Sequence, residues 1–293
     1  MRTRSRSRRT AALVLPLALS LTACGADSEG PAESAGPPTS PEVTQPSEPP
    51  APEPESPADF LDLAEKAMAA ESAWTFSVKG QEGLTLQGQK SAATYRATVR
   101  RGMAPQALQS RGVSTSSKGT TKNEQVYVVD GTAHVKEGGA NWRTAPATDP
   151  EMQNKIEDPV SVIEEFRAYA QAAGDDVKLA EANGTVELRV GSDKQQLTAV
   201  RDRAWVQKAQ REFDPTADQL RGAGIPVNDA QLTLSGLEEV LVLDAKTYRV
   251  RSHRFAFGFL VPYGGQDITY EQDVRQDNRG TFDGKVELPA DAR

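Results

Sequence analysis

The chain has 293 residues and a formal net charge of −7, with 19 prolines, two histidines and one cysteine. Its acidity argues against binding to nucleic acids, because their phosphate backbones attract basic proteins. With so few histidines and cysteines and no recognisable pairing of nucleophile and base, we expect no metal, no other cofactor and no enzymatic activity.

Residues 1–23 have the pattern of an export signal. Five arginines precede an uncharged, apolar stretch from Ala11 to Ala23. A membrane-spanning helix needs roughly 20 apolar residues, so this stretch is too short to span and indicates a removable signal peptide. Ser7-Arg8-Arg9 leaves both the general secretory route and the twin-arginine route open.

The sequence Leu21-Thr22-Ala23-Cys24 resembles the lipobox of bacterial lipoproteins. The resemblance implies that Cys24 becomes the new amino terminus and that its sulfur carries a diacylglyceryl group. Two acyl chains are sufficient for stable anchoring, whereas one is marginal. We therefore expect Cys24 to attach the protein to the outer face of the cell membrane; an unpaired thiol is the alternative.

The composition changes abruptly after the cysteine. Residues 25–57 hold 10 of the 19 prolines and seven acidic residues, with no lysine, arginine or aromatic residue. Such a segment cannot bury enough apolar surface to offset the entropy lost on ordering. We expect residues 24–57 to be a disordered tether and residues 58–293 to be one folded domain.

The domain is expected to open with a helix and continue into strands. Ser56 and Pro57 are a typical N-cap and first helical residue, and apolar residues recur at helical spacing as far as Met68. Alternating apolar residues then indicate strands, and Asp130-Gly131 and Asn183-Gly184 indicate tight hairpin turns. These strand segments are 74–78, 84–86, 95–99, 125–129, 132–136, a short strand near Trp142, 177–182 and 186–190.

Two further helical patterns interrupt the strands. One begins at Asp158 and Pro159 and ends at Gly174, and the other runs from Asp202 to Arg221 with an expected break at Asp214-Pro215. Long strands follow over residues 232–243, 248–260 and 268–274. The stretch from Arg100 to Asn123, rich in Gly, Ser, Thr and Lys, is interpreted as a loop.

This order of elements resembles the actinobacterial envelope lipoproteins of the LppX and LprG type, whose domain is similar to the LolA and LolB carriers. The residues that carry the resemblance are the lipobox, the first helix leading into Trp74-Thr75-Phe76, Val126 to Gly131 with Trp142, Val240 to Thr247, and Leu288-Pro289. It implies an α+β fold in which a single curved antiparallel sheet, a half-barrel, wraps a few helices. In the relatives an apolar cavity accommodates lipid chains.

Aromatic residues are the candidates for lining such a cavity. Phe255, Phe257 and Phe259 share one face of a predicted strand, and Trp74, Phe76 and Phe166 are expected near them. Ordinary core packing is the alternative for all six.

The other polar residues offer little chemistry by themselves. We interpret His134 and His253 as residues within strands, and the adjacent pairs Glu164-Glu165 and Glu238-Glu239 as solvated carboxylates.

Two functions remain open. The first is an anchored extracytoplasmic lipoprotein that binds a lipid, glycolipid or other hydrophobic ligand for storage or transport across the cell envelope. The second is a sensory or partner-binding envelope lipoprotein that contacts an integral membrane protein and carries no lipid. A ligand-sized cavity would favour the first and an exposed apolar patch the second.

Overall fold

The structure is a computed structural model that describes residues 53–173 and 177–292, which belong to one compact unit. The predicted signal peptide, Cys24 and nearly all of the predicted tether lie outside the described residues. Within them, no helix is long and apolar enough to cross a membrane.

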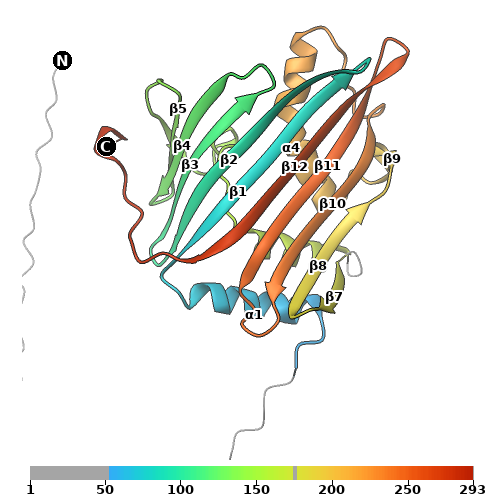
Figure 1. Cartoon of the computed structure of the whole chain (residues 1–293). Coiled ribbons are helices and arrows are strands. Elements are labelled where there is room, and N and C mark those ends of the chain that lie inside the picture. The colour runs from blue at the N-terminus through green and yellow to red at the C-terminus, as the bar shows by residue number, and fades with distance from the viewer. Residues whose placement is uncertain (1–52, 174–176, 293) are drawn as a thin grey trace, which may run out of the picture. The chain divides into compact units, whose positions relative to one another are not determined.

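The folded unit is an open antiparallel sheet of twelve strands with helices against one face (Figure 1). The helices are α1 (Pro57–Ala69), α2 (Pro150–Gln153), α3 (Val162–Ala173) and α4 (Ala204–Gly222), with 3-10 turns at Leu197–Ala199 and Ala290–Ala292. The strands are β1 (Ala73–Leu86), β2 (Gln89–Met103), β3 (Gln106–Ser116), β4 (Thr121–Val129), β5 (Thr132–Glu137), β6 (Arg143–Pro146), β7 (Lys178–Ala182), β8 (Thr185–Ser192), β9 (Gln195–Gln196), β10 (Thr233–Asp244), β11 (Val250–Tyr263) and β12 (Gln266–Thr281). The expected antiparallel sheet with a few helices is therefore confirmed.

Two meanders meet in the middle of the sheet. The strand order is β6-β5-β4-β3-β2-β1-β12-β11-β10-β8-β7, with β9 beside β10. The first strand, β1, pairs with the last, β12, over most of its length, with Gly80 opposite Val274. Because β1 and β12 pair in the middle of the sheet, the two strands at its edges are β6 and β7.

Helix α1 begins where the sequence predicts. The side-chain oxygen of Ser56 accepts a hydrogen bond from the amide of Asp59, and the Asp59 carboxylate accepts one from the amide of Ser56. This reciprocal capping box satisfies two amides that the first turn would otherwise leave unpaired. Phe60, Leu61 and Met68 then face the core.

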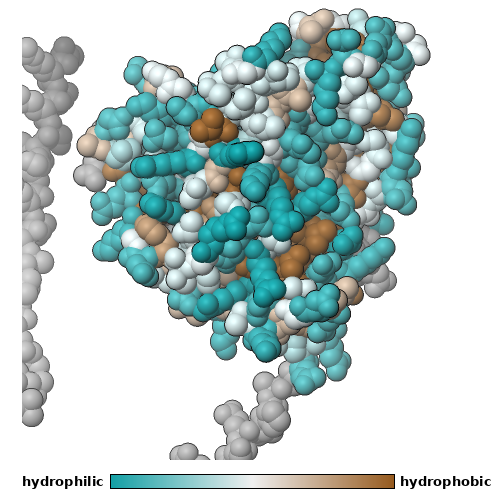
Figure 2. All heavy atoms as spheres, in the orientation of Figure 1, coloured by the Kyte–Doolittle hydropathy of each residue, from teal (hydrophilic) through white to brown (hydrophobic). Residues whose placement is uncertain are grey.

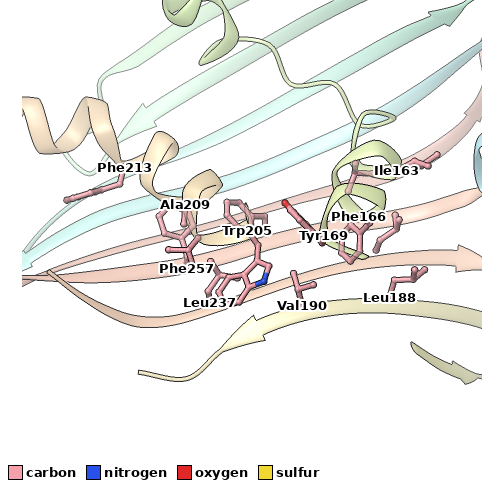
Figure 3. Packing of buried hydrophobic residues seen from close by; sticks show 14 of the residues in the cluster. Ile163, Phe166, Tyr169, Leu188, Val190, Trp205, Ala209, Phe213, Leu237 and Phe257 are labelled. Carbon is pink, nitrogen blue, oxygen red and sulfur yellow. The ribbon is translucent and has the colours of Figure 1, made fainter. Parts of the chain in front are cut away.

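Side chains from α3, α4 and the sheet fill the core between the helices and the strands. Figure 3 shows Phe166 and Tyr169 of α3 and Trp205 and Phe213 of α4 above the sheet, where Phe257 and its neighbours point toward them. The rings of Phe213 and Phe259 lie 5.0 Å apart, centroid to centroid. The opposite face of the sheet carries mainly hydrophilic side chains with scattered apolar ones (Figure 2).

The stretch from Arg100 to Asn123 is not a loop, so that prediction is wrong. It contains the end of β2, all of β3 and the start of β4. The inner side of β3 carries small residues, among them Ser110 and Gly112, because the ring of Tyr95 lies across Gly112: a Cβ there would come within 2.6 Å of that ring. Small polar residues therefore occupy a strand position where sequence patterns expect large apolar ones.

Helix α4 continues through Pro215, so the predicted break is also wrong. A proline lacks the amide hydrogen that would bond to the carbonyl four residues earlier. The buried residues Phe213, Ala217 and Leu220 keep the helical spacing on both sides of Pro215, and their packing holds the helix together. Helix α3 begins at Val162, after a turn at Asp158, and its predicted end at Gly174 lies outside the described residues.

Candidate functional site

The six aromatic residues predicted to border a cavity all lie in the main core. Trp74, Phe76, Phe166, Phe255, Phe257 and Phe259 are each no more than 4 % exposed. The centroids of the Phe255 and Phe257 rings are 5.0 Å apart and those of Phe257 and Phe259 are 5.7 Å apart, so the three strand residues pack as one stack.

Trp74 and Phe166 belong to the same core without joining that stack. The indole nitrogen of Trp74 donates a hydrogen bond of 2.8 Å to the carbonyl of Met68 at the end of α1, and Phe166 packs on Tyr169 within α3. Phe255 borders a small pocket and Phe257 a hollow on the helix-free face. A role in lining a lipid cavity stays a prediction for these six residues.

A cleft of about 470 Å³ lies between the first meander and α4. Strands β1 to β5 and β12, the segment that follows α2, and α4 supply its walls. Its lining is largely polar and charged, with Glu82, Tyr95, Ser114, Lys122, Glu124, Glu137, Lys155, Glu157, Arg211, Glu212, Thr216 and Gln272 among the residues that border it.

The geometry of β1, β2 and β3 creates this cleft. Gly80 and Gly112 carry no side chains on the inner face of the sheet, and the ring of Tyr95 lies between them. Burial raises the pKa of the Tyr95 hydroxyl above its ordinary value, so this group stays neutral and serves as a hydrogen-bond donor. A second hollow of about 590 Å³ lies largely over small and charged side chains of the opposite face. We regard the first as the candidate site because a sheet and a helix both enclose it.

Lys155 stands at one side of the cleft between two carboxylates. Its Nζ lies 2.6 Å from Oε1 of Glu137 and 3.4 Å from Oε2 of Glu124. The hydrogen bond from Lys155 lowers the pKa of Glu137, whereas burial raises the pKa of Glu124. Glu137 is therefore firmly ionised, whereas Glu124 takes up a proton more readily.

Glu157 forms the floor of the cleft. Burial, with a smaller contribution from the charge of Glu212, raises the pKa of Glu157 to about 7. One carboxylate oxygen accepts a hydrogen bond of 2.9 Å from the side-chain amide of Gln276. Glu157 also borders the adjoining pocket of about 90 Å³, so it is common to both spaces.

A fully buried carboxylate, Glu239 of β10, lies behind that pocket. The Nζ of Lys208 from α4 is 2.7 Å from Glu239 Oε1 and 2.5 Å from Glu165 Oε2 of α3. Nε2 of His253 is 2.8 Å from the same Oε1, and the hydroxyl of Tyr169 donates to Oε2 at 3.0 Å. The network thus joins α3, α4, β10 and β11.

The charges in this network stabilise one another. Burial by itself would raise the pKa of Glu239, but Lys208 and His253 outweigh it and hold that pKa at about 2. Burial would lower the pKa of Lys208, but the carboxylates of Glu239 and Glu165 outweigh it and raise that pKa. Glu239 and Lys208 are therefore an ionised pair.

The expectation that Glu239 is solvated is wrong. Glu238 does lie on the outer face, where it pairs with Arg189 and Arg254, but Glu239 points inward with Leu237 and Leu241. The two-residue period of the strand already places Glu239 with these leucines and is the signal that could have found it. Glu165 similarly faces Lys208, whereas its neighbour Glu164 pairs with Arg167 at the surface.

The two histidines lie on opposite faces of the sheet. His134 of β5 is on the helix-free face, where its Nδ1 lies 3.2 Å from the hydroxyl of Thr144. His253 is 6 % exposed and belongs to the buried network. Among the described residues, no group of three or more His, Cys, Asp or Glu side chains is arranged to hold a metal ion.

Comparisons with known proteins find no matching family and no matching curated protein. Among solved structures, the chain is similar to a beta-barrel-like protein of domain of unknown function DUF1849 from Brucella abortus, with 8 % identity, 71 % of this chain and 98 % of that chain covered, and a TM-score of 0.24. It is also similar to a DUF1329 family protein from Desulfovibrio piger, with 8 % identity and a TM-score of 0.30. That match covers 78 % of this chain and 94 % of the other. At such TM-scores these similarities carry no argument about fold or function.

Proposed function

We propose that the protein is an extracytoplasmic, membrane-anchored binding protein with a half-barrel of the LolA and LppX type, and that the cleft beside α4 takes up an amphipathic ligand such as a lipid or glycolipid. The observation that carries the proposal is the cleft of about 470 Å³, which falls within the usual size of small-molecule sites. The lipobox at Cys24 supports the location.

The lining indicates how such a ligand would bind. Tyr95, Lys155 and Glu157 offer hydrogen bonds and charge to a polar head group, while Val274 and the methylenes of the long side chains offer limited apolar contact. The aromatic core next to the cleft is already well packed. We therefore propose that the head group enters the cleft and that the acyl chains follow its open side.

The charged lining also favours a second candidate function. A segment of a partner protein could occupy the same cleft through Lys155, Arg211 and the surrounding carboxylates, with no lipid bound. This is the sensory or partner-binding alternative, in which the anchored domain reports to an integral membrane protein.

Organic extraction of the full chain purified from its native host tests the first candidate. Ser114→Trp places an indole in the cleft, whereas Thr115→Trp places the same group on the opposite face of β3. We expect mass spectrometry to find a lipid with the wild type and with Thr115→Trp, and much less with Ser114→Trp. Equal recovery from both variants contradicts the proposed site, and loss of a crosslinked membrane protein with Ser114→Trp alone supports the second candidate.

A further inference from the structure

The acidic and basic residues of the first meander lie on opposite faces of the sheet. In strands β1 to β5 the acidic residues are Glu82, Glu124 and Glu137, and all three border the cleft. Because side chains alternate along a strand, six basic residues of the same strands point to the helix-free face: Lys79, Lys90, Arg96, Arg100, Arg111 and Lys136. The helix-free face of the first meander is therefore positively charged, although the chain as a whole carries −7.

Four of these exposed side chains form what we call the basic patch: Lys79 of β1, Arg96 and Arg100 of β2, and Arg111 of β3. Lys79 lies directly opposite Arg96 in the pairing of β1 with β2. Arg111 lies opposite Thr98, the residue midway between the two arginines of β2. Three neighbouring strands span about 10 Å and four residues along a strand about 14 Å, so the four charges lie within one small area.

No carboxylate balances the charges of the basic patch. Within the described residues, none of its four side chains forms an ion pair: Arg111 donates a hydrogen bond to the hydroxyl of Tyr127, and the guanidinium of Arg100 lies over the ring of Phe282. Like charges on directly opposite residues of paired strands destabilise a sheet, so the pair of Lys79 and Arg96 costs stability. An external partner of opposite charge would offset this cost.

The second meander has the contrasting arrangement on the same face. There arginines pair with carboxylates of the same or a neighbouring strand, as in Arg189 with Glu238, Arg254 with Asp273, and Arg275 with Asp277. Paired charges of this kind leave little net charge behind. The unbalanced positive charge of the helix-free face is therefore concentrated on the first meander.

We propose that the basic patch is a docking surface for a lipid bilayer that carries anionic head groups. Such a bilayer presents many negative charges in one plane, and the four basic side chains project from one face of three neighbouring strands, so they can meet it together. Figure 2 looks onto this face, which is covered mainly by hydrophilic side chains. Docking of this kind does not require a ligand in the cleft.

An exposed apolar side chain beside the basic patch favours a bilayer over a soluble polyanion. Val113 of β3 lies directly opposite Arg96 and is 41 % exposed. In the described part of the chain, the other exposed large hydrophobic residue is Tyr263, at the end of β11. An apolar group flanked by cations suits the boundary between head groups and acyl chains, whereas a phosphate polymer offers it no apolar contact.

Sedimentation with lipid vesicles tests the proposal. Residues 52–293 form one compact unit that holds the sheet, the helices and the hydrophobic core, so this unit can be tested without the leader and Cys24. Leaving out residues 1–51 removes five arginines and five acidic residues, so the unit keeps the net charge of −7. We expect it to bind vesicles of equal parts phosphatidylglycerol and phosphatidylcholine, not vesicles of phosphatidylcholine alone, and to be released when salt screens the charges.

Matched variants separate the basic patch from the net charge. Lys79→Gln combined with Arg96→Gln should weaken binding about 30-fold, because each basic residue near an anionic membrane contributes roughly fivefold. Lys66→Gln combined with Lys246→Gln removes the same charge from α1 and from the turn between β10 and β11. This control should change the affinity by less than about twofold, because charges farther than a Debye length from the bilayer are screened.

A second pair of variants tests the apolar contact. Val113→Ser should weaken binding by about two- to fivefold, whereas Tyr263→Ser should leave it unchanged. Circular dichroism shows that each variant is folded. Equal losses in the two double variants, equal binding to both kinds of vesicle, or no vesicle binding by the wild-type unit overturns the proposal. Binding to soluble polyphosphate without binding to vesicles also overturns it, in favour of a polymer as the partner.

Discussion

Glu238 and Glu239 are neighbours in sequence and have opposite environments. Glu238 lies on the outer face, where its side chain is 38 % exposed and pairs with arginines, whereas Glu239 is fully buried and bonded by Lys208, His253 and Tyr169. Removing one partner of a buried ion pair leaves the other charge uncompensated, which costs much more than loss of a surface pair.

This contrast gives a matched pair of substitutions. Glu239→Gln should lower the free energy of unfolding by about 3–5 kcal/mol, because Lys208 loses its fully buried counter-charge and keeps only the partly exposed Glu165. Glu238→Gln should lower it by less than about 1 kcal/mol. Urea unfolding followed by circular dichroism measures both values. Similar losses in the two variants would contradict the assigned roles.

The raised pKa of Glu157 leads us to expect a specific pH dependence of the free energy of unfolding. This pKa is about 7 in the folded protein and 4.5 as the ordinary value. Between these values the folded protein holds a proton that the unfolded chain releases, so the free energy of unfolding falls as the pH rises from about 4.5 to about 7.

We expect Glu157→Gln to remove this part of the slope. Urea unfolding is measured at about pH 5 and at about pH 8. Between these two pH values, the free energy of unfolding should fall by about 1–3 kcal/mol more in the wild type than in the variant. Thr115→Trp is a control outside the network and should keep the wild-type slope. Parallel pH profiles for wild type and Glu157→Gln would show that Glu157 titrates normally.

Two paired glycines in neighbouring strands differ in how much space surrounds them, and therefore in how well they should tolerate a larger residue. Gly258 of β11 and Gly236 of β10 are paired in register. A Cβ on Gly258 would lie 2.8 Å from the carbonyl oxygen of Tyr270 and 2.4 Å from Oγ of Ser235, whereas the nearest atom to a Cβ on Gly236 is at 3.9 Å.

The two sites should respond differently to alanine. Gly258→Ala should destabilise the protein by about 1–3 kcal/mol, because the backbone of β12 has to move. Gly236→Ala should be neutral or stabilising by up to about 1 kcal/mol, since alanine loses less backbone freedom on folding. Thermal unfolding ranks the two variants, and a tolerated Gly258→Ala would contradict the close strand packing.

Local sequence patterns specify some elements of this fold and not others. The capping box at Ser56, the Asp130-Gly131 and Asn183-Gly184 turns and the long strands β10 to β12 are predictable, because local chemistry or strict alternation specifies them. Strand β3 and the unbroken α4 are not, because they depend on tertiary contacts: the ring of Tyr95 over Gly112, and the buried residues on both sides of Pro215.

The candidate site was harder to predict than the fold. Sequence patterns identify the aromatic residues of β11 and direct attention to apolar residues. The cleft, in contrast, is bordered mainly by polar residues of β1 to β5, β12, α4 and the segment after α2. Lys155 and Glu157 are two residues apart, but they lie far in sequence from Glu124 and Gln276 and meet these residues only through the order of the strands. Glu239 is the exception, because the alternation of β10 places it among buried leucines.

For the whole molecule, the proposed lipid anchor at Cys24 can be tested separately from the cleft. A fatty-acid label supplied to the native host should appear on the wild-type protein and be absent from Cys24→Ala, because the sulfur of Cys24 is the expected acceptor of the lipid. The variant should also leave the membrane fraction. Equal labelling of both proteins would contradict the lipobox interpretation.

The proposed function requires that the cleft beside α4 holds a ligand. Native mass spectrometry of the intact chain, released gently from host membranes, measures this directly. We predict a bound mass on the wild type and on Thr115→Trp that is absent from Ser114→Trp. A wild-type protein whose mass is only that of its own chain and of any lipid attached to Cys24 would contradict the proposed function.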